Sequence, residues 1–233
     1  MSMEMMPDLP DDILAKIVKL VADDRWWLLG PILKAGTRGR NIVYRSDVLK
    51  DANIYSLCTD PSDLYSFRCQ TTGVQMKGRY RDFFERCLNS GNNTAIYYEG
   101  LMVVAEERDV KRGIALLHQN VPDDGLATFA CGVLSICAGD EEMAVHYLEV
   151  FGGKHCKLGT EEVRRYGEEL VHDLQPYRRH TSFPLRKTFV YPICKELPSP
   201  DCAMDCATVS GPYEILCNEC YLWWLSRKVS QML

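Results

Sequence analysis

The sequence predicts a mainly α-helical protein, and three observations lead to this fold class. An amphipathic helical pattern begins near residue 10, two similar segments of about 30 residues follow in the middle, and four cysteines gather near the end. We expect an N-terminal helical segment over residues 7–50, a short stack of paired helices with capping helices over 78–175, and a cysteine-rich segment with a terminal helix over 190–233.

The first helix is expected to begin at Pro10. Proline favours an extended residue before it and a helix start after it, and Asp11 and Asp12 suit the N-cap and the first turn, where the helix end is positive. The apolar residues that follow recur at helical spacing and form a wide stripe: Ile13, Leu14, Ile17, Val18, Leu20 and Val21. More than one surface must cover so wide a stripe.

Shorter elements are expected before the repeats. A second helix is predicted around Trp27–Leu33, a polar basic turn at residues 37–40 and a short helix from Ser46. A further helix over residues 83–90 places Phe83, Phe84, Cys87 and Leu88 inward. Gly91 follows it at the position where a left-handed residue commonly ends a helix.

The middle of the chain repeats itself. Ala95 and Gly100 return as Ala127 and Gly132, 32 residues later, and residues 112–117 correspond to 141–146 at an offset of 29. Each copy is predicted as helix, turn, helix, with small residues that let the paired helices approach closely. An ordinary helical domain with a chance similarity remains the alternative. At least about three units are usually needed to bury a continuous face, so the helix expected after Thr160 is assigned to cap the stack.

The cysteine spacing near the end suits a metal. Four thiols fall within nineteen residues: Cys202, Cys206, Cys217 and Cys220. A structural zinc ion takes four such ligands in a tetrahedron, and pairs of cysteines with two to four residues between them supply these ligands. The predicted cofactor is therefore one structural zinc ion, and free thiols are the alternative. The helix expected after Cys220 carries a broad apolar face that would dock on the body.

Composition limits the function. The chain has 233 residues, 46% hydrophobic content and a net charge of −5, with a pI of about 5.6. An acidic chain without a basic patch argues against general nucleic-acid or membrane-surface binding. Eleven cysteines and no signal-peptide pattern favour reduced thiols in the cytoplasm or nucleus. The sequence contains none of the common catalytic motifs, and we expect a protein that is not an enzyme.

The start of the chain resembles the first helix of an F-box. F-boxes begin with a Leu-Pro-x-Asp-hydrophobic-hydrophobic pattern, which Leu9, Pro10, Asp12, Ile13 and Leu14 match. In that family this start packs against the Skp-type adaptor of cullin–RING ubiquitin ligases. The resemblance therefore implies a set of adaptor-binding residues: Leu9, Pro10, Asp12, Ile13, Leu14 and Ile17.

A second resemblance, over roughly residues 7–152, is to plant F-box proteins with Sel-like repeats, a tetratricopeptide-type class. In these proteins the F-box is followed by an aromatic-x-Arg-Cys-x-x-Ser-Gly-Asn helix end, which this chain carries at residues 84–92. The resemblance implies a non-catalytic substrate receptor that links an unknown protein target to the ligase. The alternative is a zinc-stabilised repeat scaffold with a degenerate F-box. A weaker alternative is an interaction module in the cysteine-rich tail.

Overall fold

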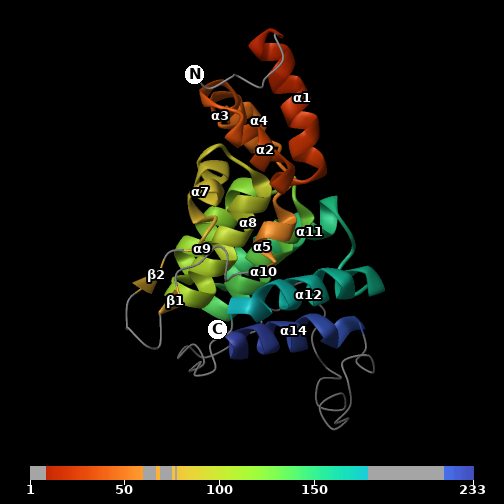
Figure 1. Cartoon of the computed structure of the whole chain (residues 1–233). Helices are drawn as coiled ribbons and strands as arrows, with labels where there is room; N and C mark the ends of the chain where they lie inside the picture. The colour runs from red at the N-terminus through yellow and green to blue at the C-terminus, as the bar shows by residue number, and fades with distance from the viewer. Residues whose placement is uncertain (1–8, 60–66, 69–74, 77, 178–217) are drawn as a thin grey trace. The chain divides into compact units, whose positions relative to one another are not determined.

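The computed structural model describes residues 9–59, 67–68, 75–76, 78–177 and 218–233, and the mainly helical fold class is confirmed (Figure 1). The chain divides into two compact units, residues 1–98 and 99–233, and the boundary falls inside one helix, α8. None of the described helices is both long and apolar enough to cross a membrane.

Short helices build the first unit. In chain order the elements are α1 (Asp11–Asp24), the 3-10 helix η1 (Trp26–Leu28), α2 (Leu29–Lys34), α3 (Thr37–Val43), α4 (Ser46–Lys50), α5 (Tyr55–Cys58), β1 (Phe67–Arg68), β2 (Gln75–Met76), α7 (Arg81–Asn89) and the start of α8 (Asn93–Met102). The two strands pair antiparallel, with Phe67 opposite Met76.

Helix α1 begins as the sequence predicts, with one difference. Asp11 and Asp12 lie in the first turn, but Pro10 takes the N-cap position and no side chain caps the helix. The inward face carries Leu14, Ala15, Val18 and Ala22, all buried, and packs on α3 and α4. The predicted second helix appears as η1 and α2, and the short helix from Ser46 is α4.

The turn predicted at residues 37–40 is wrong, because these residues open helix α3. Packing explains the difference. A Cβ atom on Gly39 would lie 2.3 Å from the Ile32 carbonyl oxygen, so the absence of a side chain lets α3 lie against α2. Ile42 and Val43, one turn later, are buried. Burial of Ile42 and Val43 stabilises the helix. The polar residues 37–40, by themselves, are typical of a turn and do not indicate this helix.

Helix α7 ends as predicted. Gly91 has φ +78°, its N–H donates to the Leu88 carbonyl at 3.0 Å, and the N–H of Asn92 donates to the Cys87 carbonyl at 3.1 Å. These two bonds define a Schellman motif. Phe84 and Cys87 are buried, whereas Phe83 and Leu88, also predicted inward, are only half-buried.

The second unit is a stack of longer helices. After α8 come the π-helix η2 (Val103–Glu107), α9 (Val110–Leu117), the 3-10 helix η3 (His118–Asn120), α10 (Gly125–Ala138), α11 (Glu141–Lys154), α12 (Glu161–Leu174), the 3-10 helix η4 (Gln175–Tyr177) and α14 (Asn218–Met232). Helix α10 is central: it packs on α9, α11, α12 and α14, and residues 127–137 are all buried (Figure 1). The helix predicted after Thr160 and the terminal helix are both present, as α12 and α14.

Candidate functional site

An apolar stripe of α1 faces outward. Ile13 is 43% exposed, Ile17 45% and Leu20 73%, and their spacing of three and four residues places them on one helix face. The wide stripe predicted from the sequence thus divides between two faces, because the neighbouring Leu14 is only 3% exposed and belongs to the core. An exposed row of large aliphatic side chains on a helix is a feature of protein-binding surfaces.

The six predicted adaptor-binding residues do not all lie on the surface of the first unit. Leu9 and Pro10 are exposed just before α1, and Asp12 is exposed in its first turn. Ile13 and Ile17 lie on the outward stripe, and Leu14 points into the first unit. The surface that a partner can reach therefore consists of the exposed residues alone.

Two exposed side chains near the end of α1 were missed as binding candidates. Trp27 and Leu28, in η1, are both more than one-third exposed, and the guanidinium of Arg25 lies 5.3 Å from the Trp27 ring centroid. The local sequence predicts only a helix for these two residues and gives no sign of a binding role. Large exposed aromatic residues are enriched at the energetic centres of protein interfaces.

Two arginines hold the start of α1. Arg38, in α3, donates through Nε to the Asp11 carboxylate at 2.9 Å and through Nη2 to the Leu9 carbonyl oxygen. Arg45, in the turn between α3 and α4, donates to Asp12 and to Asp47, each at 3.0 Å. The hydrogen bond from Arg45 lowers the pKa of Asp47. The start of α1 is thus held by α3 and by the turn between α3 and α4.

The repeat is real, and the same contact recurs in both copies. A Cβ atom on Gly100 would lie 2.7 Å from Cγ of Leu117, and a Cβ atom on Gly132 would lie 2.8 Å from Cγ of Leu148. In each copy the leucine of the second helix packs on the glycine of the first. This confirms that the small residues serve the close approach of paired helices.

The caps of the helices repeat as well. Asn92 and Asp124 cap the first helices, accepting hydrogen bonds from the N–H groups of Ala95 and Ala127. Asp109 and Asp140 cap the second helices in the same way. Side-chain oxygens at this position bond to amides that the helix itself leaves unpaired.

The predicted offset of 29 for the second helices is wrong. Asp109 and Asp140 are 31 residues apart, and so are Leu117 and Leu148. The second copy is therefore shorter by one residue, not three. The extra residue of the first copy is accommodated in the π-helix Val103–Glu107, because a π turn takes one more residue than an α turn. Arg108 and Gly139 both have a left-handed backbone conformation. Each directly precedes one of the two capping aspartates.

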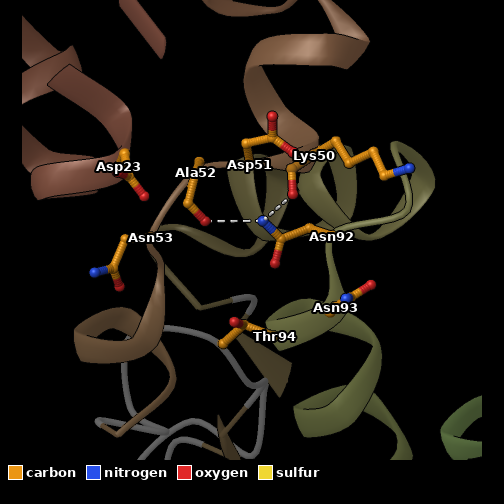
Figure 2. Close-up of a pocket in the computed structure, with 8 residues that line it drawn as sticks. All are labelled: Asp23, Lys50, Asp51, Ala52, Asn53, Asn92, Asn93 and Thr94. Carbon is orange, nitrogen blue, oxygen red and sulfur yellow. Dashed lines mark hydrogen bonds between the residues drawn. The ribbon is translucent and has the colours of Figure 1, made fainter. Parts of the chain in front are cut away.

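A polar pocket of about 280 Å³ lies beside Asn92 in the first unit (Figure 2). The side-chain amide of Asn92 is buried and donates to three carbonyl oxygens, of Leu49 at 3.0 Å, Lys50 at 3.0 Å and Ala52 at 2.8 Å. Its Oδ1 accepts from Ala95. Asn92 thus joins the segment after α4 to the start of α8, and its role is structural.

We expect Asn92→Asp to destabilise the protein by about 3–5 kcal/mol, because an unpaired charge would be buried against three carbonyl oxygens. Asn92→Ala should cost less, about 1–3 kcal/mol. Burial raises the folded-state pKa of the new carboxyl above its unfolded value of about 3.9, so its destabilisation is largest at neutral pH and shrinks as the pH falls through that raised pKa. Urea denaturation at pH 7.5 and pH 5 measures both effects. Equal stability of the two variants at pH 7.5 would contradict the assignment.

The buried cysteines are packing residues, as the sequence predicts for Cys87. Desolvation raises the pKa of Cys87, Cys131 and Cys137 to about 12 in each case. Thiols with so high a pKa are poor nucleophiles because the thiolate is scarce at neutral pH. Cys156 is also buried, and burial raises its pKa. Within the described ranges, no group of three or more His, Cys, Asp or Glu side chains is arranged to hold a metal ion.

The predicted zinc ligands fall mainly outside the described residues. Cys202, Cys206 and Cys217 lie there, and Cys220 is in the first turn of α14, where only its backbone is described. Zinc binding therefore stays a prediction. Protein purified from zinc-supplemented cells should contain about one zinc per chain by plasma mass spectrometry. Cys217→Ser with Cys220→Ser should remove it, while Cys156→Ser, a matched thiol elsewhere, should not; zinc unaffected by the double variant would refute the site.

Comparison with known families supports the repeat assignment. Residues 71–171, from just before α7 into α12, match the family described as plant tetratrico peptide repeats. Comparison with curated proteins and with solved structures found no match. The match and the paired helices together define a helical-repeat segment, which is a protein-interaction scaffold, and repeats of this type are typically non-catalytic.

Proposed function

We propose that this protein is a non-catalytic substrate receptor of a Skp–cullin–RING ubiquitin ligase. Its N-terminal segment binds the Skp-type adaptor, and its repeats recruit a protein target. The chain performs no chemistry, since the ligase transfers ubiquitin through its other subunits.

The observation that carries the proposal is the open stripe of α1. The F-box resemblance implies that Ile13 and Ile17 face an adaptor, whereas a degenerate F-box would bury them inside the chain. Both side chains are more than 40% exposed. Leu9 and Pro10, at the start of the motif, are exposed as well. Apolar burial of this stripe would provide the favourable free energy of adaptor binding.

The test is size-exclusion chromatography of the purified chain mixed with a Skp-type adaptor. We expect co-elution at micromolar concentration. Leu9→Ala combined with Pro10→Ala should abolish the complex and leave the far-ultraviolet circular dichroism largely unchanged, because neither residue lies within α1. Unchanged co-elution of the double variant, or separation of the wild-type chain from the adaptor, would refute the receptor role.

A repeat scaffold with a degenerate F-box is the second candidate. The family match favours it, because the matched residues cover the repeats and not the N-terminal segment. In this case the protein binds its partners without any adaptor. Separation of the wild-type chain from the adaptor would select this function.

A further inference from the structure

We propose that Arg38 and Arg45 are positioning residues of the adaptor-binding surface. They hold the Leu9–Pro10 start and the first turn of α1 in the orientation that the adaptor meets. This inference rests on the proposed function, because it names the residues that prepare the same surface for its partner.

The geometry gives each arginine a separate task. Arg38 bonds both to the carboxylate of Asp11 and to the backbone carbonyl of Leu9, so it fixes the chain just before the helix. Arg45 bonds to Asp12, one residue further on, and Asp47 in turn holds Arg45. The planar guanidinium can serve two acceptors at once, which a lysine ammonium does with less geometric control.

The start of α1 needs contacts of this kind to stay ordered. Helix α1 has no side-chain N-cap, and the residues before a helix are prone to fraying unless they are tied down. A frayed start would require the adaptor to order Leu9 and Pro10 at its own cost in binding free energy. The two arginines supply that order in advance.

The ion pairs contribute little to global stability. The Asp11 and Asp12 side chains are 64% and 83% exposed, and solvent screens pairs of this kind. Loss of the arginines should therefore change adaptor affinity far more than thermal stability. This separation distinguishes a positioning role from a purely structural one.

The experiment measures adaptor affinity by isothermal titration calorimetry for the full chain. Arg38→Ala with Arg45→Ala should raise the Kd at least about tenfold and move the Tm by less than about 3 °C. Arg165→Ala is the matched control, since Arg165 forms a similar exposed pair with Glu162, and it should leave the Kd unchanged. The charge exchange Arg38→Asp with Asp11→Arg should restore part of the affinity that Arg38→Asp alone removes.

The outcomes separate the two proposals. A wild-type chain that fails to bind the adaptor overturns the proposed function together with this role. A wild-type chain that binds, with a double variant of equal affinity, overturns only the positioning role. A charge exchange that restores nothing overturns the assignment of this role to the Arg38–Asp11 ion pair. Amide exchange of residues 11–14 in the free chain should be faster in the double variant than in the wild type.

A second inference comes independently from the glycines: we infer that α12 and α14 form a third repeat unit. A Cβ atom on Gly167, in α12, would lie 2.8 Å from Cδ2 of Leu225 and 2.3 Å from the hydroxyl oxygen of Tyr221, both in α14. This reproduces the packing of Leu117 on Gly100 and of Leu148 on Gly132. The two helices lie side by side (Figure 1).

Further contacts join α14 to the stack. The Tyr221 hydroxyl donates to the Arg164 carbonyl at 3.1 Å, and the Cys137 thiol of α10 donates to the Ser226 carbonyl at 3.3 Å. Leu225 and Val229 are buried. In the first two units the paired helix follows within a few residues, but here 43 residues separate α12 from α14. A third unit supplies the minimum number that a repeat stack usually needs.

Hydrogen exchange of the full chain tests the third unit. Amides of α14 should exchange as slowly as those of α12 and α10, because one cooperative unit opens together. Gly167→Ala should lower the Tm and speed exchange in both α12 and α14. Gly153→Ala is the control, since a Cβ atom there meets nothing within 4 Å. Fast exchange of α14 beside protected α12, or an unchanged Tm for Gly167→Ala, would overturn the inference.

Discussion

Replacement of Ile13 and Ile17 by aspartate is expected to weaken adaptor binding by at least about 100-fold. Full burial of each isoleucine at an interface is worth about 1.5–3 kcal/mol, and 1.4 kcal/mol is a factor of ten in Kd. A carboxylate buried in the same place adds a desolvation cost. Because both side chains are exposed in the free chain, the variant should lose only about 0.5 kcal/mol of folding stability. Calorimetric titration and thermal unfolding measure the two quantities.

Two controls make this result specific. Met143→Asp places the same charge on an exposed apolar position of α11 and should leave adaptor affinity unchanged. Leu14→Asp, on the buried face of α1, should unfold the first unit because Leu14 is in its core. An Ile13 and Ile17 double variant that unfolds, or that binds as tightly as wild type, would contradict the receptor role.

Phe129→Ala is expected to lower the free energy of unfolding of the second unit by about 3–5 kcal/mol. Phe129 is fully buried on α10, with its ring centroid 5.0 Å from that of Phe151 on α11 and 6.1 Å from that of Tyr166 on α12. Phe151 and Tyr166 also meet edge to face, at 4.9 Å. Truncation of Phe129 would leave a cavity where three helices of the stack converge.

Chemical denaturation followed by circular dichroism measures this loss. Met143→Ala, an exposed position on α11, serves as the matched truncation and should change stability by no more than about 0.5 kcal/mol. A loss of less than about 1 kcal/mol for Phe129→Ala would mean that the aromatic group does not join the three helices. Adaptor binding should persist in the folded fraction of this variant, since Phe129 lies outside the first unit.

Helix α1 has two apolar faces, one buried in the first unit and one exposed. Leu14 and Val18 fix the helix in the first unit, while Ile13, Ile17 and Leu20 remain open. A helix of this kind is stable without a partner and still has apolar surface to bury against one. The exposed Trp27 and Leu28 add to the apolar surface of the same unit.

Features that depend on neighbouring residues could be predicted from the amino-acid sequence alone. Pro10 and the acidic first turn mark the start of α1, Gly91 ends α7, and the recurrence of Ala95 and Gly100 reveals the paired helices. These signals are local because a cap, a left-handed glycine or an apolar period acts within one or two turns of helix. For that reason the mainly helical fold and the two repeat units could be predicted.

Which residues meet across longer distances is visible only in the folded structure. It divided the wide stripe of α1 into a buried and an open face, formed α3 through the contact of Gly39 with Ile32, and set the offset of the second helices at 31 through the packing of Leu117 and Leu148. It also paired α12 with α14 across 43 intervening residues. Such choices depend on packing between segments far apart in the chain, and no local pattern in the sequence records them.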